Sequence, residues 1–373
     1  MKYLFILGRN VELSQLEIKS YFKKNSIELF NEFNKLNGFL VNIDKNFADG
    51  SIKNLGGTIS IGEVLAEGTK EEIFGLIDEK EIYVGEKNNI NFCLWNFSES
   101  EEEVLRYLKK RFKSEKLKAV FKPSNDKMDL QSGEKVNFPG SKNLDEEYFV
   151  FENEEIVYFG QITQKSDYEE IERRDMEKPV RRESLAISPR LAKILINLSE
   201  VKEGEKLVDP FCGIGVVLEE ALNQGIKVIG IDRDKRAIEG AKKNLEWFKF
   251  DKDNYDLFNE DSRKVEISES QGIATEPDLG QILRKTPTKE NAKKTLREFE
   301  ILMSEVLNNL KKKVSGKFVF TSPLIRVGKK RKSCNIEDIC EATGLNLIGE
   351  GIDEFRENQI VGRRIFVLEH TNN

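Results

Sequence analysis

Histidine and cysteine are scarce in this chain of 373 residues. It contains one histidine, His370, close to its end, and four cysteines with no Cys-x-x-Cys pair. Catalytic triads and many metal sites need histidine, and structural zinc sites usually need paired cysteines. Because scattered cysteines are typical of a reducing compartment, we expect a cytoplasmic protein without a metal.

Long apolar runs are also absent. No stretch approaches the ~20 apolar residues that a membrane-spanning helix requires, and the first eight residues (MKYLFILG) are too short for a signal peptide. Charged residues make up 34% of the chain and hydrophobic residues 38%. These features predict a soluble protein with no membrane partner, and the length predicts two or three domains.

Positive charge is in the minority overall but is concentrated in short runs. The net charge is −6 and the isoelectric point is near 5.4, which does not indicate nucleic-acid binding. Basic runs lie at residues 109–113, 173–174 with 181–182, and 326–332. A solvated surface would explain any one of them, but three runs in an acidic chain favour a polyanionic partner.

The pattern of apolar residues changes in the middle of the chain. Residues 1–165 predict small α+β units that end in a hairpin of Glu147–Phe151 and Ile156–Ile162, and residues 166–185 have the charged composition of a linker. From residue 186 strands alternate with helices, which predicts a Rossmann-like α/β domain with a parallel sheet. Its expected strands are Lys206–Pro210, Lys227–Asp232, Tyr255–Asn259, Gly272–Glu276 and Lys317–Thr321.

The most informative motif follows the first of these strands. The run from Asp209 to Gly215 (DPFCGIG) places an acid before a glycine loop, and Asp232 ends the next strand. Asp232 lies 23 residues after Asp209, a separation that fits one strand–helix–strand unit. Gly213 and Gly215 would let the backbone turn and approach a ligand, and Asp232, followed by Arg233, stands where a ribose diol needs an acceptor. The motif predicts a nucleoside-cofactor site.

The kind of nucleoside follows from what the loop lacks. A dinucleotide loop has a third glycine where this chain has Leu218. An acid before the loop would repel a pyrophosphate, whereas it suits the sulfonium and ammonium groups of S-adenosylmethionine. We therefore predict S-adenosylmethionine as the cofactor. A nicotinamide dinucleotide and a structural turn without a ligand are the alternatives.

A second acidic motif, Glu276-Pro277, ends the fourth expected strand. Ligands of open α/β sheets lie at the carboxyl ends of the strands. That rim would hold Asp209, Asp232, Asp261 and Glu276, with the basic run at 326–332 beside them. A carboxylate and a carbonyl fixed by proline can hold an exocyclic amine towards a methyl donor, so that catalysis is mainly positioning. The alternative is that Glu276-Pro277 only terminates a strand.

Four segments of the chain carry a resemblance to a known family. They are LGRNVELS at 7–14, RDMEKPVRR at 174–182, SPRLAKILINL at 188–198 and the glycine loop at 209–215. With them the chain resembles the THUMP-domain tRNA guanosine N2-methyltransferases of archaea and eukaryotes, which modify the D-arm junction, or an uncharacterised relative of them. The resemblance implies a ferredoxin-like segment and an RNA-binding THUMP-like domain in residues 1–165. It implies a class I methyltransferase domain in residues 186–373.

The resemblance also implies roles for individual residues. The expected cofactor-binding residues are Asp209, Phe211, Gly213 and Gly215 at the methionine end, Asp232 at the ribose and Asp261 at the adenine amino group, with Arg233 next to Asp232. Glu276 and Pro277 would correspond to the first two residues of the family signature Asp-Pro-Pro-aromatic-Gly. This chain has Glu-Pro-Asp-Leu-Gly there, so Leu279 replaces the aromatic residue that would stack on a flipped-out base.

The sequence therefore predicts an S-adenosylmethionine-dependent RNA N-methyltransferase that acts on the exocyclic amine of a guanosine in tRNA. The expected RNA-binding residues are Lys329, Lys330, Arg331, Lys332, Arg181 and Arg182. A methyltransferase for DNA or another acceptor is one alternative, and a tRNA-binding protein that no longer transfers methyl groups is another. Whether an accessory protein takes part stays open.

Overall fold

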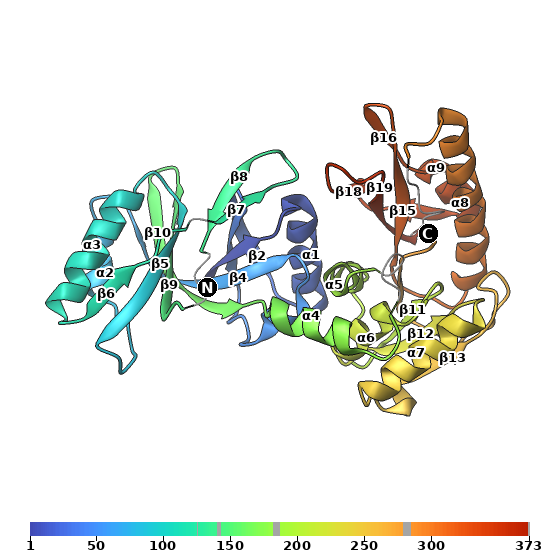
Figure 1. Cartoon of the computed structure of the whole chain (residues 1–373), viewed down its shortest axis with the longest axis horizontal. Coiled ribbons are helices and arrows are strands. Elements are labelled where there is room, and N and C mark those ends of the chain that lie inside the picture. The colour runs from blue at the N-terminus through green and yellow to red at the C-terminus, as the bar shows by residue number, and fades with distance from the viewer. Residues whose placement is uncertain (125, 140–142, 182–186, 279–284, 372–373) are drawn as a thin grey trace. The chain divides into compact units, whose positions relative to one another are not determined.

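The structure is a computed structural model, and it describes residues 1–124, 126–139, 143–181, 187–278 and 285–371 (Figure 1). The chain divides into two units. The first comprises residues 1–15, 27–53 and 57–166, and the second comprises residues 16–26, 54–56 and 167–373. No helix in the described part of the chain is long and apolar enough to cross a membrane.

A mixed sheet forms the centre of the first unit, and within the described residues it has eight strands in the order β2-β3-β1-β4-β10-β9-β5-β6. The strands are β1 (Lys2–Leu7), β2 (Leu29–Lys35), β3 (Gly38–Ile43), β4 (Thr58–Gly68), β5 (Asn89–Phe97), β6 (Lys118–Phe121), β9 (Glu146–Asn153) and β10 (Ile156–Lys165). Residues 146–165 therefore form the predicted hairpin, with antiparallel pairing of β9 and β10. Two short strands, β7 (Asp126–Asp129) and β8 (Lys135–Phe138), pair separately.

The helices α2 (Ile73–Asp78) and α3 (Glu101–Ser114) accompany this sheet, whereas α1 (Val11–Lys24) and η1 (Ser51–Asn54) are each divided between the two units. Fully buried aromatic residues pack α2 and α3 against the sheet, among them Phe92, Phe112, Tyr148 and Phe159. Burial of such large side chains supplies most of the favourable free energy of a layer of this kind.

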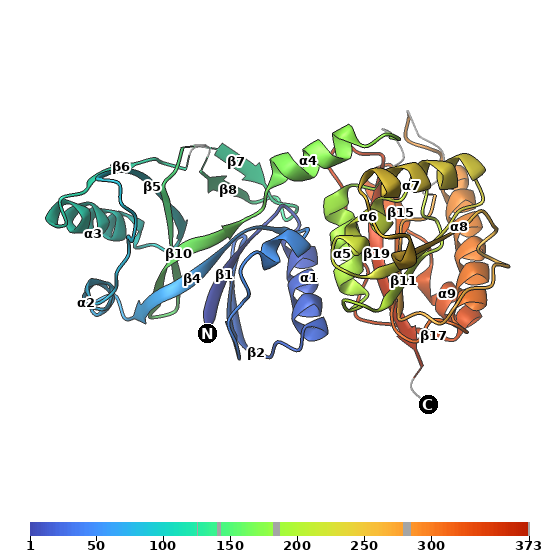
Figure 2. The same cartoon turned by 90° about the horizontal axis from the view of Figure 1, so that it is seen from below.

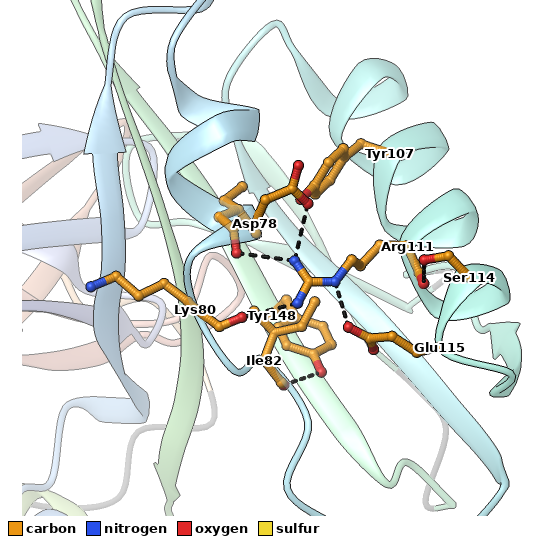
Figure 3. A network of polar contacts seen from close by, with 9 residues as sticks. Asp78, Lys80, Ile82, Tyr107, Arg111, Ser114, Glu115 and Tyr148 are labelled. Atoms are coloured by element: carbon orange, nitrogen blue, oxygen red, sulfur yellow. Dashed lines mark hydrogen bonds and ion pairs between the residues drawn. The ribbon is translucent and has the colours of Figure 1, made fainter.

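Arg111 belongs to the first basic run, and Figure 3 shows that its guanidinium lies within a polar network between α2 and α3. It donates hydrogen bonds to the carbonyls of Ile77 (3.2 Å) and Lys80 (3.1 Å), and it pairs with Asp78 (3.1 Å) and Glu115 (2.5 Å). The Ile77 carbonyl lies in the last turn of α2 and also accepts from the amide of Lys80 (3.0 Å), so Arg111 adds to the contacts that close this helix end. Arg111 is therefore a structural residue, and the run at 109–113 is not a uniform surface patch.

A second sheet forms the centre of the second unit, with the strand order β13-β12-β11-β14-β15-β19-β17 among the described residues. Its strands are β11 (Lys206–Asp209), β12 (Lys227–Ile231), β13 (Tyr255–Phe258), β14 (Gly272–Thr275), β15 (Phe318–Val327), β16 (Lys330–Lys332), β17 (Leu345–Leu347), β18 (Ile352–Glu354) and β19 (Val361–His370). The strands β11 to β15 are parallel, and β19 is antiparallel to β15. The predicted Rossmann-like sheet is confirmed, with one antiparallel strand inserted near its edge.

Helices cover both faces of this sheet. They are α5 (Pro189–Leu198), α6 (Val216–Leu222), α7 (Lys235–Trp247), α8 (Lys289–Leu310) and α9 (Ile336–Thr343). The helix α4 (Tyr168–Glu177) and the short η2 (Lys252–Asn254) also belong to this unit, and neither has a buried residue. Figure 2 shows α5 and α6 on one side of the strands and α8 and α9 on the other. The apolar face of α8, which includes Phe299, Met303 and Leu307, is buried against the sheet.

The strand β15 is longer than predicted. The expected strand ended at Thr321, but the strand runs on through Pro323 to Val327 and pairs with β19 as far as Ile325, although proline rarely lies inside a sheet. The neighbour on its other side, β14, ends at Thr275, so Pro323 lies where β15 has one neighbouring strand among those described. The extension adds about 20 Å of strand beyond Thr321.

Candidate active site

The glycine loop joins β11 to α6 at the carboxyl edge of the sheet. Gly213 and Gly215 both have positive φ, +53° and +94°, as the motif predicts. A Cβ placed on Gly213 would meet no atom within 4 Å, whereas one on Gly215 would lie 3.3 Å from Cβ of Ala241 in α7. Gly213 therefore borders open space that a ligand can enter, and Gly215 permits the close packing of α6 on α7.

Asp232 lies directly beside this loop. Its Oδ2 accepts a hydrogen bond from the amide of Gly213 (3.0 Å), and its Oδ1 accepts one from the amide of Asp234 (2.8 Å). The side chain of Asn259 donates to the carbonyls of Asp232 (3.0 Å) and the exposed Arg233 (3.1 Å). The end of β12 is therefore held rigidly, with the Asp232 carboxylate fixed against the loop.

Asp209 is buried below the loop. Its carboxylate accepts hydrogen bonds from the Thr275 hydroxyl (2.5 Å) and the amide of Phe211 (3.1 Å). Burial raises its pKa to about 7; these hydrogen bonds oppose the shift, and the nearby charges of Asp232 and Glu276 add to it. Three of the four predicted rim acids are therefore close enough to interact, and Asp209 also ties β11 to the end of β14.

Asp261 is held differently from the other acids. Arg263 pairs with its carboxylate (2.5 Å), and hydrogen bonding to Arg263 lowers the pKa of Asp261 to about 2 despite partial burial. The segment is attached to the glycine loop, because the Ser262 hydroxyl donates to the carbonyl of Pro210. Asp261 thus lies near the loop, but an adenine amino group would share its carboxylate with Arg263.

Glu276 follows β14 on the same edge, and Pro277 beside it is buried. Arg363 of β19 grips the Glu276 carboxylate with two hydrogen bonds, from Nε to Oε2 and from Nη2 to Oε1 (2.9 Å). Glu276 and Arg363 side chains are only 8% and 21% exposed. Leu279 and Gly280, which complete the signature, lie outside the described residues. Sequence reasoning missed Arg363, although two adjacent arginines in a buried strand signal a need for acidic partners.

Asn244, a fully buried residue of α7, holds the glycine loop through hydrogen bonds. Its amide nitrogen donates to the carbonyls of Ile214 and Val180, both at 3.0 Å, and its oxygen accepts from the amide of Val180 (3.0 Å). The segment that precedes α5 is therefore joined to the glycine loop through one side chain. An amide in the middle of an amphipathic helix was the only sequence signal for it.

A cluster of buried charges supports α6, the helix that the loop begins. Lys178 pairs with Glu219 (3.3 Å) and Asp175 (2.7 Å), while Glu220 pairs with Arg174 (3.3 Å) and Lys193 (3.7 Å). The side chains of Lys178 and Glu219 are 1% and 4% exposed. Burial raises the pKa of Glu219 to about 7, although Lys178 opposes the shift. The charges join the segment at 174–178 to the helix that positions the loop.

The basic run at 326–332 forms a hairpin of β15 and β16 that extends beyond the rim. Lys329, Lys330 and Lys332, three of the residues expected to bind RNA, are exposed. Arg331 instead turns inward, with its guanidinium 4.1 Å from the centre of the Phe355 ring and a hydrogen bond to the carbonyl of Gln359 (2.6 Å). Since β15 continues past Thr321, the lysines project from the rim rather than lining it. Arg181 is exposed, and Arg182 lies outside the described residues.

The structure fits S-adenosylmethionine at the loop. Gly213 faces open space, and the acids Asp209 and Asp232 lie beside the loop, where they suit a cationic ligand better than a pyrophosphate. Among the described residues, no group of three or more histidine, cysteine, aspartate or glutamate side chains could hold a metal ion.

Comparisons with known proteins agree with this fold. TrmN from Thermus thermophilus aligns over the full length of both chains with a TM-score of 0.56 at 14% identity, which shows a shared fold. The tRNA (guanine(10)-N2)-dimethyltransferase of Methanothermobacter thermautotrophicus is 36% identical over 115 residues, which cover 31% of this chain and 33% of that one. The enzyme of the same name from Methanocaldococcus jannaschii is 34% identical over 142 residues, covering 36% and 37%. The chain thus spans about a third of the length of these curated relatives.

The sheet and the glycine loop define a methyltransferase domain of the class that uses S-adenosylmethionine. The profile of the RMKL-like methyltransferase domain matches residues 179–320. A second profile, of a DNA methylase family, matches residues 12–243, which is more than half of the chain. The chain therefore belongs to this methylase family.

Proposed function

We propose that the protein transfers a methyl group from S-adenosylmethionine to the exocyclic amine of a guanosine in tRNA. The observation that carries this proposal is the convergence of the open glycine loop, Asp232 and the Glu276-Pro277 pair at one edge of a methyltransferase sheet. The similar tRNA (guanine(10)-N2)-dimethyltransferases support the choice of tRNA and of the guanine amine.

The chemistry asks little of the protein beyond orientation. Bound S-adenosylmethionine supplies an electrophilic methyl group. Glu276 and the carbonyl next to Pro277 would accept the N–H groups of the amine, so that its lone pair faces the methyl group. Asp232 would accept the ribose hydroxyls, and Asp209 would hold the loop in shape. The proton released from the methylated nitrogen can pass to water, which removes the need for a strong protein base.

We infer that the first unit binds the tRNA. The order β4-β1-β3-β2, with α1 after β1, suits the expected ferredoxin-like segment, and the remaining strands with α2 and α3 would form the THUMP-like part. The exposed lysines of the hairpin would add contacts to phosphates. Contacts of this kind position an RNA without reading its sequence.

The contribution of the β15–β16 hairpin to tRNA binding can be measured by neutralising its three exposed lysines together. Changing Lys329, Lys330 and Lys332 to glutamine should weaken tRNA binding and reduce the slope of log affinity against log salt by up to about 2. Binding of S-adenosylmethionine should stay unchanged. The matched control changes three exposed lysines on or next to the end of α7, Lys242, Lys243 and Lys249. If both triple variants have the wild-type slope, the hairpin does not contact phosphate.

The proposed acceptor is tested by presenting labelled S-adenosylmethionine with unmodified tRNA, duplex DNA and a mixed protein substrate in parallel. Transfer to tRNA alone is the expected result. Transfer to DNA or to protein, with none to tRNA, would refute the choice of acceptor while leaving the cofactor assignment intact.

A tRNA-binding protein without methyl transfer is the second candidate function. Arg363 occupies both oxygens of the Glu276 carboxylate, which is the observation that favours it. The two candidates differ in one result: tRNA and S-adenosylmethionine both bound, with no methylated nucleoside after prolonged incubation, supports the second and excludes the first.

A further inference from the structure

Glu276 is fixed by a residue from a strand that is not its neighbour. β14 pairs with β15, and β15 in turn pairs with β19, where Arg363 lies opposite Pro323. Arg363 therefore reaches across β15 to the residue that follows β14. On the way, the hydroxyl of Thr321 in β15 lies 3.5 Å from Oε2 of Glu276. The side chain of glutamate is one methylene longer than that of aspartate, which extends its reach towards Arg363.

The two hydrogen bonds determine how Glu276 can meet a substrate. A carboxylate has about four positions for hydrogen-bond donors. Arg363 and Thr321 approach Oε2, and Arg363 also occupies one position on Oε1. Among the described residues no other donor reaches Oε1 of Glu276, so one position on that oxygen is left. A bidentate pair with a planar guanidinium also holds the plane of the carboxylate, which gives that position a fixed direction.

The ion pair of Arg363 and Glu276 is largely buried, unlike most ion pairs that arginine forms at a protein surface. Burial lowers the pKa of Arg363, but the hydrogen bonds to Glu276 and the charges of Glu276 and Glu354 together outweigh it. The pKa of Arg363 therefore lies above its usual value, and the guanidinium remains charged. The next residue in β19 provides a contrast, since Arg364 pairs with Asp353 (3.0 Å) with its side chain 40% exposed. The strand thus contains one arginine directed to the candidate site and one that is not.

We propose that Arg363 is a positioning residue for methyl transfer, which acts by aiming the free position of Glu276 Oε1 at an N–H group of the acceptor amine. The inference rests on the proposed function, because it assigns Glu276 to the acceptor. Arg363 itself touches Glu276 and not the reacting atoms. Its effect should therefore appear in kcat, and the KM for S-adenosylmethionine should not change.

The experiment is a double-mutant cycle on the full chain, with kcat and KM measured for tRNA methylation. The variants are Arg363→Met, Glu276→Gln and both together, with Arg364→Met as the matched control. Misplacing a catalytic group by about 1 Å can cost roughly 100-fold, so we expect Arg363→Met to lower kcat by 10- to 100-fold. In the Glu276→Gln background the same change should lower kcat less than threefold. Arg364→Met should stay within threefold of the wild type.

Three results bear on the proposal separately. An unchanged kcat in Arg363→Met would overturn it, and so would an equal loss in both backgrounds, because Arg363 would then act independently of Glu276. An unchanged kcat in Glu276→Gln would instead refute the assigned role of Glu276. If Arg363→Met fails to fold, Arg363→Lys keeps the charge without the bidentate geometry. The proposal then requires a lowered kcat with an unchanged KM, and a wild-type kcat would overturn it.

Discussion

The buried pair of Lys178 and Glu219 gives a sharp prediction for the stability of the second unit, in which Glu219 lies in α6, the helix after the glycine loop. The structure has Lys178 between Glu219 and Asp175, with both members of the main pair almost fully buried. In the variant Lys178→Met the aliphatic packing is largely kept, but Glu219 loses its cation. We expect the variant to be less stable than the wild type, and the difference to depend strongly on pH.

The size of the effect follows from the pKa of Glu219, which burial raises from 4.5 to about 7 in the folded protein. Ionisation of Glu219 lowers stability as the pH rises from about 4.5, and this loss levels off above pH 7, where the folded state is ionised as well. Without Lys178 the pKa of Glu219 in the folded protein should rise further, so the variant continues to lose stability above pH 7. If Glu219 stays protonated in the variant, the destabilisation grows by about 1.4 kcal/mol between pH 6 and pH 8.

Urea unfolding at pH 6, 7 and 8 measures this directly. The fluorescence of Trp247 in a Trp95→Phe background reports on the second unit alone. Lys202→Met removes an exposed lysine and is the control. A destabilisation that is constant, or that shrinks as the pH rises, would refute the reasoning. In the double variant Lys178→Met, Glu219→Gln no buried acid remains at this position, so the contribution of Glu219 to the pH dependence of stability is lost. Its destabilisation relative to the wild type should then shrink by about 1.4 kcal/mol between pH 6 and pH 8, opposite to the single variant.

Three further predictions concern the loop and the first unit. If S-adenosylmethionine binds the ionised form of Asp209, its affinity should rise about eightfold from pH 6 to pH 7.5, given the pKa of about 7, and Asp209→Asn should abolish the rise in calorimetric titrations. Asp232→Ala should weaken cofactor binding by roughly 10- to 100-fold, because a charged acceptor for the Gly213 amide and the ribose is lost, and an unchanged dissociation constant would reject this role. Arg111→Met should destabilise the first unit by about 2 kcal/mol, as followed by Trp95 fluorescence, and a change below 0.5 kcal/mol would contradict its structural role.

The architecture of the second unit could be predicted closely because its signals are local. Parallel strands covered on both faces are short apolar runs bounded by turn residues, and β11 and β12 end within a residue of their expected ends. The glycine loop could be predicted equally well, because its backbone has positive φ at positions 213 and 215, where glycine is favoured. These features depend on residues that are adjacent in the sequence.

The helix α4 could have been predicted from its capping residue and charge spacing, but the polar composition of the segment favoured a linker instead. Residues 166–185 are rich in charge and suggested a linker, yet Asp167 caps the helix by accepting from the amide of Glu170 (2.9 Å). Ion pairs between Arg173 and Glu177 and between Glu170 and Arg174, each four residues apart, then stabilise its exposed surface. The spacing of those charges indicates a helix, which the overall polarity concealed.

The parts of the candidate site that could not be predicted depend on contacts between distant residues. Arg363 and Glu276 are 87 positions apart and meet only because β19 lies beside β15. Asn244 reaches Val180 across 64 positions for a similar reason. Arg331 looked like one more exposed cation, but its guanidinium stacks on Phe355, which belongs to a loop later in the chain. A single sequence does not specify these pairings until the sheet order is known.

The most direct test of the central claim is methyl transfer to unmodified tRNA, with the product nucleoside identified by mass spectrometry. Wild-type protein and Glu276→Ala should be compared with S-adenosylmethionine and tRNA at saturating concentrations. The account predicts a guanosine methylated at N2 with the wild type, and a loss of at least tenfold in its rate of formation with the variant. A methylated nucleoside formed equally fast by both proteins, or none formed by wild-type protein that binds both ligands, would contradict it.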